Sequence, residues 1–78
     1  MDATKITYEG IKSTINETMI SAEDTRELGK LEIFLLGYIS AFRHIEIITD
    51  KEFEALNKLI NELWKLHNEA LEKLENKR

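Results

Sequence analysis

The chain has 78 residues, of which 42% are hydrophobic and 33% are charged, and it contains neither cysteine nor proline. This length predicts one small domain over residues 1–78. The absence of cysteine excludes a disulfide scaffold, a thiolate metal site and a cysteine nucleophile. The net charge of −4 argues against a nucleic-acid partner, because nucleic-acid affinity comes largely from cationic side chains that neutralise phosphates.

The sequence shows no pattern of a membrane span or a secretory signal. The most apolar stretch, residues 33–39, falls well short of the ~20 apolar residues that a spanning helix needs. No basic region followed by an apolar run stands near residue 1. We therefore expect no membrane partner and a cytoplasmic location.

The first predicted helix covers about residues 5–18, with Thr4 or Thr7 at its start. Gly10 weakens its start, because glycine lowers helix stability relative to alanine. The next helix is predicted to follow an N-cap at Ser21, with Asp24 placing negative charge in the first turn. The apolar positions of the first helix recur at helical spacing: Tyr8, Ile11, Ile15 and Met19.

The second predicted helix covers residues 22–43 and is apolar around most of its circumference. Such a helix needs cover on more than one side. Gly37 lies in its most apolar part, where glycine is costly unless another backbone approaches closely. We interpret Gly37 as a packing position for the 5–18 helix or for a second subunit. A groove that admits a ligand is the alternative.

The third predicted helix covers residues 50–76 and has the clearest start. Thr49 and Glu52 form a capping box, and Ile48 and Phe53 are placed as a hydrophobic staple around it. These features predict an all-α fold, a small three-helix protomer.

The 50–76 helix spans about 40 Å at 1.5 Å per residue, which is longer than either other helix. We therefore expect part of its apolar stripe to need cover from a second copy, since symmetric dimers are the commonest soluble oligomers. The sequence predicts a homo-oligomer, with a dimer favoured, formed through the second and third helices. A monomer with a frayed C-terminal helix is the alternative. The residues expected to need this cover are Leu63, Trp64, Leu66, Leu71 and Leu74.

Residues 42–56, FRHIEIITDKEFEAL, resemble the short C-terminal oligomerisation hairpin (SHOCT-like) found at the ends of many bacterial proteins. In that hairpin a helix ends, a segment of the type x-I-T-x-x-E-F follows, and a second helix begins. This chain has Glu46 where the family usually has glycine. The whole chain also resembles small phage and prophage helical proteins. The resemblance implies association between helical hairpins.

The sequence contains no recognisable catalytic or metal-binding pattern. His44 and His67 lie outside the spacings that direct two ligands to one metal. No glycine-rich loop is present to bind phosphate. A carboxylate pair for acid–base work needs a carboxylate in an apolar pocket. Glu32, the one carboxylate closely flanked by apolar residues, is expected to snorkel or to face solvent. We expect no enzyme activity, no cofactor and no metal.

Two functions remain compatible with the sequence. The first is a small non-enzymatic protein that self-associates and binds another protein, as a bacterial or phage-encoded regulator or inhibitor. Its expected anchors are aromatic, because aromatic side chains dominate interfaces: Phe34, Tyr38, Phe42 and Trp64. The alternative is an oligomer that sequesters an anionic or nucleotide-like small molecule, for which arginines and backbone donors must converge. The residues expected there are Arg26, Gly37, Tyr38 and Arg43.

Overall fold

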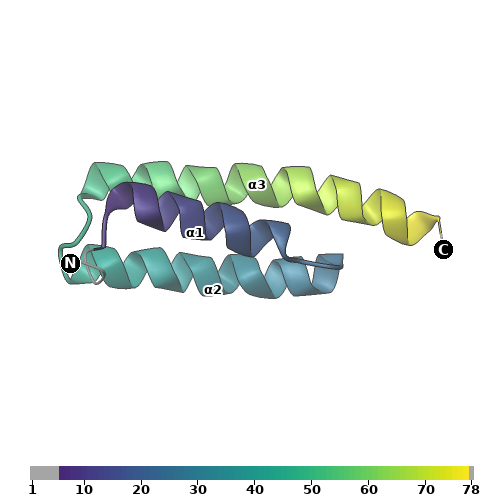
Figure 1. The fold of residues 1–78 in the computed structure, drawn as a ribbon, viewed down its shortest axis with the longest axis horizontal. Coiled ribbons are helices and arrows are strands. Elements are labelled where there is room, and N and C mark those ends of the chain that lie inside the picture. The colour runs from purple at the N-terminus through teal and green to yellow at the C-terminus, as the bar shows by residue number, and fades with distance from the viewer. Residues whose placement is uncertain (1–5, 78) are drawn as a thin grey trace.

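The computed structural model describes residues 6–77, which form three α-helices: α1 (Tyr8–Ile20), α2 (Thr25–His44) and α3 (Asp50–Asn76). The predicted all-α, three-helix fold is thus confirmed. Figure 1 shows α2 and α3 running in opposite directions, with α1 alongside both and parallel to α3. None of the helices in this part of the chain is long and apolar enough to cross a membrane.

The first helix starts directly after Thr7, the later of the two predicted starting residues, and ends later than predicted. Thr7 is its N-cap, with its side chain accepting a hydrogen bond from the Gly10 backbone N–H at 3.0 Å. Gly10 therefore lies inside a capped first turn. Position 5, where the helix was expected to begin, lies outside the described residues. The C-terminal end extends to Ile20, because Met19 still belongs to the buried face.

The predicted N-cap at Ser21 is wrong. Ser21 is the C-cap of α1, and its hydroxyl donates to the Thr18 carbonyl oxygen at 2.6 Å. Asp24 caps α2 instead, with extended backbone and a carboxylate that accepts from the Glu27 N–H at 2.7 Å. Both residue types cap helices well, but only Asp24 is followed directly by helical backbone, which begins at Thr25.

The capping box at the start of α3 is confirmed. The Glu52 N–H donates to Thr49 Oγ1 at 3.1 Å, and the Thr49 N–H donates to Glu52 Oε1 at 2.9 Å. Ile48 is buried, and Phe53 packs against the same core. The staple residues thus join the turn to the hydrophobic interior.

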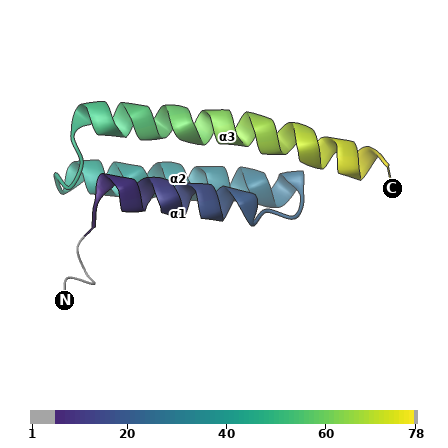
Figure 2. The ribbon, with the colours of Figure 1, turned by 45° about the horizontal axis from the view of Figure 1, so that its top comes forward.

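The core takes one face from each helix. Leu63, Trp64 and Leu71 pack against this core within a single chain, so the expectation that they need a second copy is wrong. Leu66 and Leu74 do remain exposed, by 65% and 56%. The far end of α3 extends beyond the other helices (Figures 1 and 2). The buried residues are Ile11, Ile15, Met19, Leu28, Leu35, Ile39, Ile48, Leu56 and Ile60.

The connection from α2 to α3 is a Schellman turn. The Ile47 N–H donates to the Phe42 carbonyl at 2.9 Å, and the Glu46 N–H donates to the Arg43 carbonyl at 3.1 Å. These two bonds satisfy carbonyls that the helix end leaves free. Glu46 has a φ of 61°, in the left-handed region that favours glycine.

Candidate functional site

The most exposed apolar side chains of α2 lie next to each other. Ile33 is 71% exposed and Phe34 is 60% exposed, whereas Leu35, the next residue, is fully buried. Since α2 contributes Leu28, Leu35 and Ile39 to the core, the opposite side of the helix faces solvent. We call this side the outer α2 face; its residues, all exposed, are Arg26, Lys30, Ile33, Phe34, Gly37 and Ala41.

Gly37 is not required by packing within the chain. A Cβ built at this position would meet no atom within 4 Å. The interpretation that the first helix packs on Gly37 is therefore wrong, because α1 lies elsewhere. Packing of another chain on Gly37 stays a prediction. Gly29 in the same helix also has no neighbour within 4 Å of a Cβ, but it is half-buried.

Three of the four predicted aromatic anchors form one row on α2. The rings of Phe34 and Tyr38 stack with centroids 6.1 Å apart, and those of Tyr38 and Phe42 meet edge to face at 4.7 Å. Tyr38 and Phe42 pack against the core, while Phe34 stands outside it. The Phe34 ring therefore packs on Tyr38 at one end of the row, and it is the most accessible ring of the three.

Trp64, the fourth predicted anchor, lies on α3 and packs against the core. Its Nε1 atom is buried, and no hydrogen-bond acceptor for it is found within the described residues. Most of this side chain contributes to the interior, unlike that of Phe34.

The residues of the small-molecule alternative are spread along α2. Arg26 lies near the start of the helix and Arg43 near its end, about 26 Å apart at 1.5 Å per residue. Arg43 is engaged locally, because its Nε donates to Asp50 Oδ1 at 2.9 Å and its guanidinium lies 4.9 Å from the Phe53 ring centroid. The two arginines do not converge on one anion.

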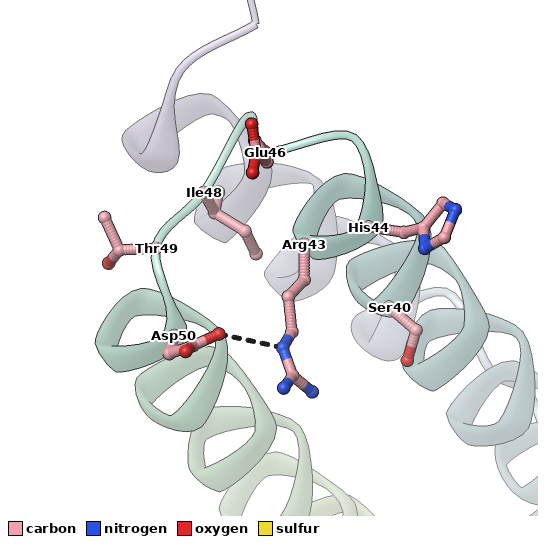
Figure 3. A pocket seen from close by; sticks show the side chains of 7 residues that line it. All are labelled: Ser40, Arg43, His44, Glu46, Ile48, Thr49 and Asp50. Atoms are coloured by element: carbon pink, nitrogen blue, oxygen red, sulfur yellow. Dashed lines mark hydrogen bonds and ion pairs between the residues drawn. The ribbon is translucent and has the colours of Figure 1, made fainter.

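An open hollow lies beside the α2–α3 turn, and no sequence pattern pointed to it. Its volume is about 530 Å³. Figure 3 shows Arg43 reaching toward Asp50, while the ring of His44 points away from that pair. Its fully charged side chains are Arg43, Glu46 and Asp50, and Arg43 is paired with Asp50, so the hollow presents no group of like charges that would select an anion or a cation. Its lining residues are Ser40, Arg43, His44, Glu46, Ile48, Thr49 and Asp50.

Chemistry-bearing side chains are dispersed in the part of the chain that the structure describes. No three His, Asp or Glu residues there come together as a possible metal site. Comparison with family models, curated proteins and solved structures found no match to this chain. The resemblance of residues 42–56 to SHOCT-like hairpins stays a prediction. The left-handed backbone at Glu46 is compatible with the glycine which that family has at the position.

Sequence reasoning did not identify Ile33 as a site residue. The signal was present, because Ile33 lies about half a turn from the buried Leu35 and well away from the buried Ile39. This signal could not be used, because α2 carries apolar residues on several sides and the sequence does not say which of these sides α1 and α3 cover.

Proposed function

We propose that this chain is a small non-enzymatic protein that binds another protein through the outer α2 face and also associates with itself. The observation that carries the proposal is the adjacent exposure of Ile33 and Phe34, by 71% and 60%, beside an unobstructed Gly37. Contiguous exposed apolar side chains of this kind mark interaction sites. A cytoplasmic regulator or inhibitor of bacterial or phage origin fits this description.

Phe34 is the proposed anchor of the binding surface. Aromatic side chains dominate binding energy at interfaces. The stacking of Phe34 on Tyr38 restricts its rotamers before binding, which lowers the entropy cost of association. Phe34 is thus accessible to a partner, and its ring is already held in place by Tyr38.

The partner that best fits this face is an amphipathic helix with carboxylates beside its apolar stripe. Glycine allows two helix backbones to approach closely, so an apolar side chain of the partner can lie over Gly37. Arg26 and Lys30 continue the outer α2 face toward the start of the helix. Their charges favour acidic groups on the partner and disfavour basic ones.

The decisive variant is Gly37→Ala, because it separates folding from binding. An added methyl meets nothing in the free chain, so the variant gains about 0.5–1 kcal/mol of helix stability. The same methyl obstructs a helix packed on the outer α2 face and weakens binding. Gly29→Ala is the matched control for the gain in helix stability, since it adds a methyl to the same helix about two turns before Gly37, at a half-buried position at the border of the outer α2 face.

The measurement is capture of proteins from a cell extract by the immobilised chain, with identification by mass spectrometry. We expect a protein that the native chain and Gly29→Ala retain, and that Gly37→Ala and Ile33→Asp lose. Thermal unfolding must show that both alanine variants are at least as stable as the native chain. Equal retention by Gly37→Ala and Ile33→Asp, or no specific retention by the native chain, would refute this binding surface.

A further inference from the structure

The second half of α3 carries an exposed apolar stripe separate from the outer α2 face. Leu66 and Leu74 are 65% and 56% exposed, and Ala70 between them is exposed as well. The three residues are four apart, so they lie along one side of the helix. The small side chain of Ala70 at the middle would allow another helix to cross closely.

This stripe continues the side of α3 that α1 covers. Ala55, Leu59 and Glu62 line a hollow with Tyr8 and Lys12 of α1. Leu66 follows these α3 residues at helical spacing.

The stripe is open because α1 is short. α1 and α3 run in the same direction, and α1 has 13 residues against 27 for α3. α1 therefore ends at Ile20 before the end of α3 is reached, as Figure 2 shows.

The charges beside the stripe change sign along the helix. Glu62 and Glu69 come before Ala70, the middle of the stripe. Lys73 and Lys77 come after it. All four side chains are exposed. Within residues 6–77 the one ion pair joins Arg43 to Asp50, so these four charges make no ion pair there.

We propose that two copies of this chain pair through the second halves of their α3 helices, antiparallel and centred on Ala70. This inference rests on the self-association in the proposed function and assigns its surface. In this register Leu66 of each copy lies opposite Leu74 of the other. The acidic part of each helix lies opposite the basic part of the other, so that Glu69 comes near Lys73 and Glu62 near Lys77.

The charge pattern selects both the occupant and its direction. In a parallel pair the flank of each helix that bears Glu69 and Lys73 would lie on the opposite side of the contact from the same flank of the other copy, so these charges would not meet. An antiparallel second copy matches all four charges and the leucines at once. Because the contact is one helix pair, it lies at the small end of specific interfaces, and we expect a reversible dimer.

The test is molar mass by light scattering and sedimentation over about a hundredfold concentration range, using the full chain. Glu69→Lys alone places lysine against lysine at both symmetric contacts, and Lys73→Glu alone places glutamate against glutamate. We expect each to weaken dimerisation roughly tenfold. An equimolar mixture of the two variants restores opposite charges at both contacts and should dimerise at least as tightly as the native chain.

The matched controls are Glu54→Lys and Lys58→Glu, which reverse a pair with the same spacing on an exposed part of α3 away from the stripe. They should leave dimerisation unchanged. Circular dichroism must show equal helix content, because each reversal also changes charge contacts along its own helix.

Two results would overturn the proposal in different ways. A dimer that Ile33→Asp abolishes, and that the Glu69 and Lys73 variants and Leu66→Asp leave intact, would keep self-association but move it to the outer α2 face. A monomer throughout the concentration range would remove self-association from the proposed function. It would leave protein binding by the outer α2 face to be judged by its own capture test.

Discussion

Replacing Glu46 with glycine should stabilise the protein. Glu46 has a φ of 61° at the position of a Schellman turn where glycine is most common. Its backbone N–H donates to the Arg43 carbonyl at 3.1 Å, and glycine keeps that donor. The substitution therefore preserves the turn and removes only the side chain that makes the left-handed conformation costly.

The size of the effect follows from two opposing contributions. A non-glycine residue in the left-handed region costs about 1–2 kcal/mol relative to the right-handed region. Glycine loses about 0.4–1 kcal/mol more conformational entropy on folding than a residue with a Cβ. The difference predicts that the free energy of unfolding rises by about 0.5–1 kcal/mol, which for a domain of this size raises Tm by about 2–8 °C.

The assay is urea and thermal unfolding followed by circular dichroism and by fluorescence of Trp64, the single tryptophan. Protein concentration is held constant and low, because a dimer would add stability by mass action. Glu46→Ala is the control for loss of the carboxylate, since alanine keeps the Cβ and therefore the strain. Lys58→Gly, at an exposed position inside α3, should destabilise by up to about 1 kcal/mol.

A lower free energy of unfolding for Glu46→Gly would contradict a cost of the left-handed backbone at Glu46. An equal gain in stability for Glu46→Ala and Glu46→Gly would contradict it as well, because the gain would then come from removing the carboxylate and not from relieving the backbone. A change in the urea m-value would show that the compactness of one of the two states had changed.

Two further stability predictions concern helix ends. Thr49→Ala removes the side-chain oxygen that accepts from the Glu52 N–H, so urea unfolding should show a loss of about 1 kcal/mol; an unchanged midpoint would contradict the role of the capping box. Glu75→Ala removes the carboxylate that accepts from the Thr25 N–H and hydroxyl at 2.8 and 3.1 Å. This variant should lose about 1 kcal/mol of unfolding free energy and show faster amide exchange in the last turns of α3. Glu75→Gln keeps an acceptor oxygen and should raise the exchange rates less. Equal exchange rates in the native chain and both variants would contradict the role of this contact.

The α2–α3 turn illustrates how far local sequence patterns can be followed. The capping box was predictable because Thr49 and Glu52 bond to each other's backbone three residues apart, and such contacts depend on few other residues. The N-cap of α2 was not, since Ser21 and Asp24 are both good capping residues. The choice depended on where α1 ends, and Met19 extends α1 because it is needed in the core.

The candidate site was predicted only in part. Phe34, Tyr38 and Phe42 are four residues apart, so the sequence placed them in one row along a helix. It could not tell that Phe34 lies outside while Tyr38 and Phe42 pack inward. All three are aromatic, and their exposure depends on the arc of α2 that α1 and α3 cover.

The sequence by itself determined the three helices, their order and the start of α3, because helical periodicity and end-capping arise from contacts between residues a few positions apart. Only the tertiary structure decided which apolar residues remain exposed: Ile33 and Phe34 on α2, and Leu66 and Leu74 on α3. The physical reason is that exposure depends on the relative lengths and positions of neighbouring helices. α1 is too short to cover the end of α3, and the side of α2 that bears Gly37 faces away from both of its neighbours.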